Sequence, residues 1–75
     1  MNKLTFGQKA VGVEFNPSKS SAVGVCKQKI ADVIDQMNDL REQTESKEQK
    51  RLCSIAITEL QMAQMWAVKA MTWKD

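Results

Sequence analysis

The sequence predicts an all-α fold in which two long helices form a hairpin behind a short N-terminal arm. Apolar residues recur three and four positions apart over residues 17–43 and again over residues 47–72, which is the period of a helix. The polar stretch REQTESKEQKR separates the two patterns and is expected to hold the turn. Because 75 residues leave room for one domain, we expect residues 1–75 to form a single helical-hairpin domain.

Residues 1–16 form the arm and hold the segments expected to be extended or looped. Gly7 and Gly12 interrupt it, and glycine is typical of turns. In VGVEF, residues 11–15, apolar side chains alternate with glycine and glutamate, which favours a short extended segment. A lone strand is not stable, so the arm must pack on the helices.

The first helix is predicted over residues 17–43. Pro17 suits the first helical position, where the amide hydrogen that proline lacks would be unpaired anyway, and Asn16 is one of several possible caps. The apolar positions form a heptad-like seam that consists of Val23, Cys26, Ile30, Val33, Met37 and Leu40. The opposite face is expected to be charged and carries Lys27, Asp32, Asp39 and Glu42.

The second helix is predicted over residues 47–72. Ser46 and Gln49 have the spacing of a capping box, in which the serine caps the helix and the glutamine side chain reaches back to the serine backbone. Small side chains let two helices approach closely, so the expected contact with the first helix is a seam of mostly small residues. This seam consists of Cys53, Ala56, Leu60, Ala63, Ala67 and Ala70.

The end of the second helix is apolar on nearly every side. A hairpin buries one stripe on each helix, so several large apolar side chains should stay exposed, namely Met62, Met65, Trp66, Met71 and Trp73. Such a patch marks an interface, and oligomerisation is a common source of stability in a chain this small. We therefore expect self-association through this half of the helix.

Lys69 stands among these apolar residues, and two interpretations are open. Its aliphatic stem can lie along the apolar surface while the ammonium reaches water. Alternatively, it is a cation beside a symmetry axis between subunits, where its copies repel one another unless an anion binds them together.

Composition and spacing exclude several functions. The chain has 11 basic and 9 acidic residues and a net charge of +2, which is too balanced for sequence-independent DNA binding. It has no histidine and no closely spaced cysteine pair, so we expect no zinc site and no other cofactor. A nucleophilic cysteine would lack its imidazole base, and we expect no enzyme activity.

No apolar run is long enough to cross a membrane and no signal sequence is present, which favours a reducing cytoplasm. Cys26 and Cys53 are then expected to be free and to pack as small hydrophobic side chains. A disulfide between the two helices is the alternative.

The residues that can hold a ligand are aromatic, amide-bearing or cationic. Phe15 can stack on a nucleobase or simply anchor the arm, and Asn16 offers donors and acceptors to a base edge. Lys27 and Lys29 can pair with phosphates. Arg51, near the start of the second helix, is either a ligand contact or a solvated charge.

Three stretches of the chain resemble a known family. FGQKAVGVEFNPS, VIDQMNDLRE and RLCSIAITELQMAQMWAVKAMTW are similar to the helical-hairpin sponges of bacteriophages, which are the anti-CBASS cyclic-nucleotide sponges. These share their hairpin with the Thoeris anti-defence sponges. The resemblance covers nearly the whole chain and is most specific from Arg51 to Lys69. It implies a homohexamer of interlocked hairpins that sequesters cyclic di- and trinucleotide messengers, without degrading them, in the cytoplasm of the infected bacterial host. Thoeris relatives also capture a cyclic ADP-ribose isomer.

The resemblance also implies which residues bind. Cyclic dinucleotides would lie between protomers against an aromatic residue and a helix-one lysine, which correspond to Phe15 and to Lys29 or Lys27. Cyclic trinucleotides would lie on three-fold axes against a basic residue of the second helix. That residue corresponds to Lys69 in AVKAM, and we expect Thr58, three turns earlier, to face the same axis.

Two other functions are open from the sequence. The hairpin can bind and inhibit a host protein through its Trp and Met face, or it can be a small nucleic-acid binder.

Overall fold

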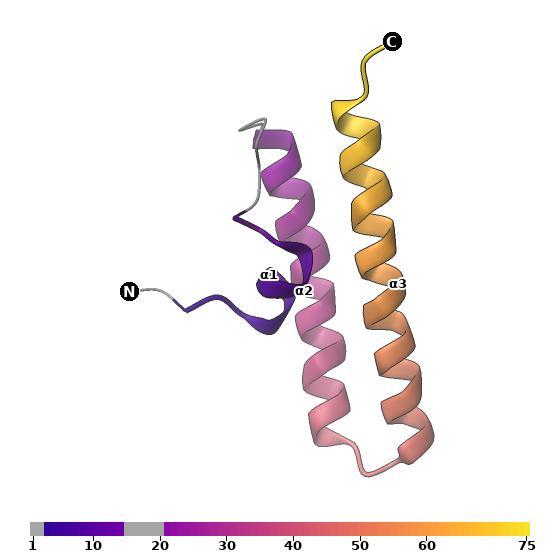
Figure 1. Cartoon of the computed structure of the whole chain (residues 1–75). Helices are drawn as coiled ribbons and strands as arrows, with labels where there is room; N and C mark the ends of the chain where they lie inside the picture. The colour runs from indigo at the N-terminus through magenta and orange to yellow at the C-terminus, as the bar shows by residue number, and fades with distance from the viewer. Residues whose placement is uncertain (1–2, 15–20) are drawn as a thin grey trace.

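The computed structural model describes residues 3–14 and 21–75 of the chain. These residues form three helices, α1 (Phe6–Val11), α2 (Ser21–Gln43) and α3 (Lys47–Thr72), and contain no strand. Figure 1 shows α2 and α3 side by side and joined by a short connection at one end. The predicted all-α class is confirmed. α3 covers the residues expected for the second helix, and α2 ends at residue 43 as expected, whereas residues 17–20 lie outside the described residues.

The extended segment expected over residues 11–15 is wrong where the structure describes it, because residue 11 ends α1, which spans residues 6–11, and residues 12–14 form a turn. Residue 15 lies outside the described residues. A complete capping box begins α1. The backbone amide of Gln8 donates to Thr5 Oγ1 at 3.0 Å, and the backbone amide of Thr5 donates to the side-chain oxygen Oε1 of Gln8 at 2.9 Å. Gly12 ends the helix in the left-handed region at φ 62°, a conformation that glycine adopts without steric cost.

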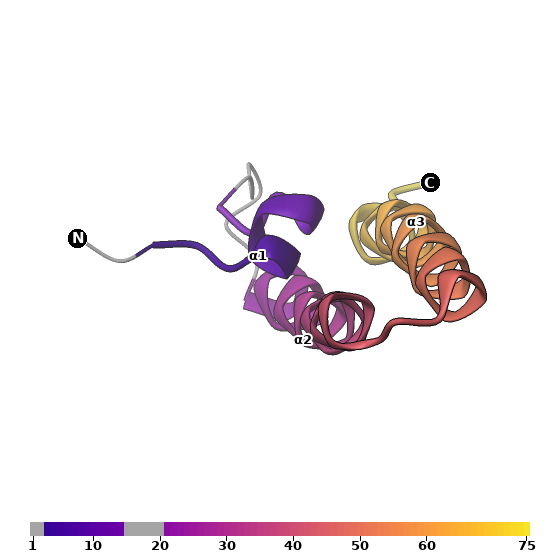
Figure 2. The same cartoon turned by 90° about the horizontal axis from the view of Figure 1, so that it is seen from below.

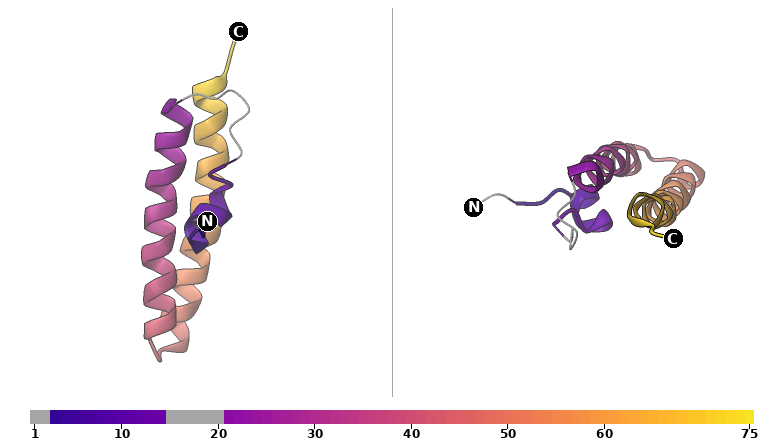
Figure 3. Two further views of the ribbon diagram at one scale, coloured as in Figure 1. Left: turned by 90° about the vertical axis from the view of Figure 1, so that its left-hand side faces the viewer. Right: turned by 90° about the horizontal axis from the view of Figure 1, so that it is seen from above.

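α1 lies across α2 near the middle of the hairpin (Figures 2 and 3). The approach is close enough that a Cβ on Gly7 would lie 2.1 Å from the Ala31 carbonyl oxygen. The Gly7 amide, free of an intrahelical partner because it is in the first turn, donates to Asp35 Oδ1 at 2.7 Å. At the other end of α1, Lys27 Nζ donates to the Gly12 carbonyl at 3.1 Å.

The hydrophobic core forms where the three helices meet. Its buried members are Val11, Ala31, Ile34 and Ile57. Arg41 also links all three helices, since it donates to Ser54 Oγ at 3.0 Å and to Asn38 Oδ1 at 2.7 Å and lies 5.4 Å from the Phe6 ring centroid. The short α1 is therefore part of the packed structure and covers a face that two helices alone would leave open.

The buried stripe of α2 matches the predicted seam only in part, since Val23 is buried and Ile30 and Met37 pack against the core. The buried residues of α2 are Val23, Lys27, Ala31 and Ile34, whereas Val33 and Leu40 of the predicted seam are 42% and 36% exposed. Lys27, expected on the charged outer face, is 3% exposed. The predicted seam considered only the contact of α2 with α3, although the arm was expected to pack on the helices. The observed stripe faces α1 as well.

The predicted small-residue seam of α3 is also wrong in part. The buried residues of α3 are Cys53, Ile57 and Gln64, while Ala63 and Ala70 are exposed. Larger side chains such as Ile57 therefore fill the contact. Cys53 is buried, Cys26 is half-buried and both are free, as the sequence predicted.

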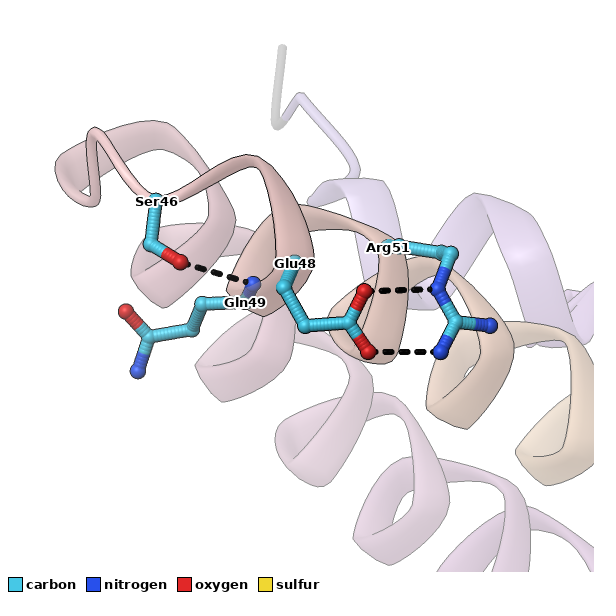
Figure 4. Close-up of polar contacts among 4 residues, drawn as sticks. All are labelled: Ser46, Glu48, Gln49 and Arg51. Atoms are coloured by element: carbon cyan, nitrogen blue, oxygen red, sulfur yellow. Dashed lines mark hydrogen bonds and ion pairs between the residues drawn. The ribbon is translucent and has the colours of Figure 1, made fainter.

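Half of the predicted capping box at the start of α3 is present. Ser46 is the N-cap, and its hydroxyl oxygen accepts a hydrogen bond from the backbone amide of Gln49 at 3.1 Å (Figure 4). The reciprocal contact is absent, because the Gln49 side chain accepts from the Thr44 hydroxyl instead. The Ser46 amide in turn donates to Thr44 Oγ1 at 3.1 Å, so Thr44 takes the role predicted for Gln49.

Candidate functional site

The structure places five of the seven candidate binding residues. Phe15 and Asn16 lie outside the described residues, so their role stays a prediction. Lys27 is placed inside the fold, with its ammonium on the Gly12 carbonyl. The other four are exposed, and each lies beside one of three hollows on the surface of α2 or α3.

Lys29 borders a hollow of about 620 Å³ near the start of α2, which we name the α2 hollow. Its other lining residues are small or apolar: Ser21, Ala22, Val25, Cys26 and Ile30. Lys29 follows Lys27 by two residues, a rotation of about 200° around the helix. The two lysines therefore point to different sides, and Lys29 is the one that a ligand in this hollow can reach.

Lys69 borders a second hollow of about 300 Å³, which we name the α3 hollow. Met62, Met65 and Trp66 form its remaining walls. The Lys69 ammonium lies 5.3 Å from the Trp66 ring centroid and 5.8 Å from that of Trp73. Both distances are within the range of cation–π attraction. The site thus combines one cation with apolar and aromatic walls.

Arg51 and Thr58 border a third hollow of about 290 Å³, together with Ser54, Ile55 and Glu59. Arg51 pairs in a bidentate manner with Glu48, at 3.0 Å from Nε to Oε1 and 2.6 Å from Nη2 to Oε2 (Figure 4). This hydrogen bonding lowers the pKa of Glu48 and raises the pKa of Arg51. The carboxylates of Glu48 and Glu59 offset the arginine charge, which makes this hollow less suited to an anion than the other two.

The predicted exposure of large apolar side chains on α3 is confirmed. Met62, Met65, Trp66, Met71 and Trp73 are between 41% and 64% exposed. Met62 follows the buried Cys53 by nine residues, which is two and a half helical turns, so it lies on the opposite side of α3. We name this side the outer stripe, which consists of Ile55, Thr58, Met62, Met65, Trp66, Lys69 and Trp73.

Thr58 and Lys69 share the outer stripe, and the expectation that both face a symmetry axis stays a prediction. They are 11 residues apart, about three turns, and both are exposed. The sequence interpretation missed the pairing of Trp66 with Lys69, because it assigned Trp66 to a protein interface, either with a second copy or with a host protein. The available signal was their separation by three residues, which places two side chains next to each other on a helix.

Comparison with known proteins identifies the hairpin. The family model described as the Acb2/Tad1 hairpin domain matches residues 8–72. The match begins within α1 and ends with the last residue of α3. No curated protein and no solved structure matches the chain. Among the described residues, no helix has the length and apolar character needed to span a membrane.

Proposed function

Because the chain belongs to the Acb2/Tad1 hairpin-domain family, we propose that it is a phage anti-defence sponge. It binds and sequesters cyclic di- and trinucleotide messengers of bacterial CBASS defence in the cytoplasm of the infected host, without degrading them. The family match over residues 8–72 is the observation that carries this proposal. Sequestration acts by mass action, so the protein needs tight binding and abundance relative to the messenger, and it needs no catalytic group.

Cyclic dinucleotides are assigned to the α2 hollow. Lys29 supplies a charge for a phosphate at the edge of a mostly apolar surface, and apolar walls with a few polar groups are typical of ligand sites. In the proposed site, Phe15 stacks on a base and Asn16 contacts a base edge.

Cyclic trinucleotides are assigned to the α3 hollow on the outer stripe, with Thr58 as a further contact. The ammonium is exposed and surrounded by apolar side chains. When copies of this stripe meet at a symmetry axis, their ammonium groups repel one another, and a bound trianionic ring relieves that repulsion. Arg51, paired with Glu48, is a peripheral contact in this proposal.

Self-association is part of the proposed function, and the assembly is a homohexamer. The outer stripe lies opposite the hairpin core and exposes Met62, Met65, Trp66 and Trp73. Exposed apolar area of this kind favours association. A second copy covers it, and the ligand sites then lie between protomers.

The proposal is tested by measuring heat of binding and thermal unfolding with a panel of cyclic dinucleotides, cyclic trinucleotides and cyclic ADP-ribose isomers. A ligand that binds only the folded state raises the unfolding temperature, and we expect this for members of the first two classes. A cyclic ADP-ribose isomer is a further ligand to be expected in this family. No binding by any cyclic nucleotide would contradict the proposal.

Cys26 provides a second test for the α2 hollow. It lines the hollow and is half-buried, whereas Cys53 is buried and serves as an internal control. A bound cyclic dinucleotide should slow alkylation of Cys26 by iodoacetamide and leave the slow reaction of Cys53 unchanged. An unchanged Cys26 rate at a saturating dinucleotide concentration would show that the ligand binds elsewhere.

An inhibitor of a host protein is the alternative function, favoured by the exposure of Trp66 and Trp73 at 64% and 63%. Aromatic side chains of this kind are enriched at binding hot spots. Native mass spectrometry separates the two functions. A homohexamer that gains mass in ligand-sized steps supports the sponge, and a monomer that gains none supports the inhibitor.

A further inference from the structure

Lys69 does not stand alone in its hollow. Three of the four lining side chains, Met62, Met65 and Trp66, offer no charge, and the Trp66 side chain is 64% exposed. A site for a phosphate group alone would surround the ammonium with further hydrogen-bond donors. Apolar walls next to a single cation instead match a nucleotide, which presents a charged phosphate and a flat apolar base to one site.

We propose that Trp66 is the base-stacking residue of the Lys69 site. This inference rests on the proposed binding of cyclic trinucleotides. Lys69 contacts the phosphate, and the indole of Trp66 stacks on the adjacent base, with Met62 and Met65 as the floor beneath it.

The contact between Lys69 and Trp66 in the unliganded chain supports this division of roles. The ammonium lies 5.3 Å from the ring centroid, and at an exposed position such a cation–π contact is weak. A phosphate competes for the ammonium by a charge-assisted hydrogen bond, which is stronger. Once the ammonium turns to the phosphate, the indole face is open to a base.

Trp73 is the matched control. It is as exposed as Trp66 and its ring centroid lies 5.8 Å from the same ammonium. However, it does not line the α3 hollow, and it follows the last residue of α3 as the C-cap. If proximity to Lys69 alone mattered, the two tryptophans would respond alike to a ligand.

The chain has two tryptophans, so each can be observed separately. Trp73→Phe leaves Trp66 as the fluorescent residue, and Trp66→Phe leaves Trp73. We expect cyclic triadenylate to quench Trp66 emission at the concentrations that saturate the calorimetric titration, and to change Trp73 emission much less. Equal responses, or an unchanged Trp66 emission at saturation, would overturn the inference.

Affinity gives the second readout. Trp66→Phe keeps an aromatic face and should bind cyclic triadenylate within about threefold of the wild type, whereas Trp66→Leu should bind about tenfold more weakly or worse. Sedimentation velocity follows the assembly in parallel. If Trp66→Leu binds as tightly as the wild type, or loses binding together with its oligomeric state, Trp66 is a packing residue and the inference fails. If the wild type itself binds no cyclic nucleotide, the proposed function fails with it, and that outcome is recognised by the wild-type titration alone.

Discussion

At the scale of single residues, exposure decides which lysine can bind a ligand. Lys27 is buried and holds α1 through the Gly12 carbonyl. Lys29 and Lys69 are exposed beside hollows with mostly apolar walls. In the proposed function these two cations serve two separate ligand sites, and each can be removed without the other.

Replacement of Lys69 by alanine should weaken one class of binding and spare the other. Losing a charge-assisted contact costs about 1.5–3 kcal/mol, so Lys69→Ala should weaken cyclic trinucleotide binding at least tenfold by calorimetry and leave cyclic dinucleotide binding unchanged. Lys74→Ala removes an exposed charge beyond the end of α3 and should change neither. Unaltered trinucleotide binding by Lys69→Ala would show that the assignment of this site is wrong.

The pair of Glu48 and Arg51 should give a small pH dependence of stability. Because its hydrogen bond lowers the pKa of Glu48 below the ordinary 4.5, the unfolded chain takes up a proton first as the pH falls. The stabilisation is therefore present above pH 4.5 and lost as the pH falls through the lowered pKa. Urea unfolding of the wild type and Glu48→Gln should differ slightly at pH 6 and converge in strong acid, with a smaller difference in high salt because both side chains are exposed. A difference that grows in acid would contradict this reading.

At the scale of elements, α1 determines which side of α2 is buried. The capping box of Thr5 and Gln8 is its one clear signal in the sequence, since six residues are too few to show a helical period. The two long helices could be predicted because periodicity, the Ser46 cap and the polar turn agree. The register of the α2 core could not, because it depends on α1, whose docking is fixed by the Gly7 amide, Asp35 and the buried Lys27.

Replacement of Gly7 by alanine should undock α1. Alanine favours helix formation, but its Cβ would lie 2.1 Å from the backbone oxygen of Ala31, and such overpacking typically costs about 1–3 kcal/mol. Gly7→Ala should therefore lower the free energy of unfolding and increase hydrogen exchange at the amides of α1. Lys9→Ala, at an exposed position of the same helix, should do neither. Unchanged exchange in Gly7→Ala would mean that the close approach to α2 is absent in solution.

At the scale of the whole molecule, the exposed side of α3 is the feature that a single chain does not explain. The sequence predicted this exposure because the helix end has more apolar residues than a hairpin can cover, and Met62 and Trp66 are exposed as expected. The sequence could not separate an oligomer interface from a ligand surface, because both require exposed apolar side chains. The hollow formed by Trp66 and Lys69 depends on rotamers, which periodicity does not specify.

A charge on the outer stripe should dissociate the assembly. Met62 and Leu52 are matched in exposure at 50% and 51%, but only Met62 lies on the outer stripe. Met62→Glu should sediment as a monomer at concentrations where the wild type is oligomeric, since an unpaired carboxylate in an apolar interface is costly. Leu52→Glu should retain the assembly. Dissociation by both variants, or by neither, would place the interface elsewhere.

The central claim is that the protein holds its ligand without altering it. The most direct measurement loads the purified protein with a cyclic trinucleotide, removes free ligand, digests the protein with protease and identifies the released nucleotide by mass spectrometry. We expect the intact cyclic molecule in an amount equal to that bound. Recovery of a linear nucleotide would show a hydrolytic enzyme and contradict the sponge, and recovery of no nucleotide would show that the protein does not bind it.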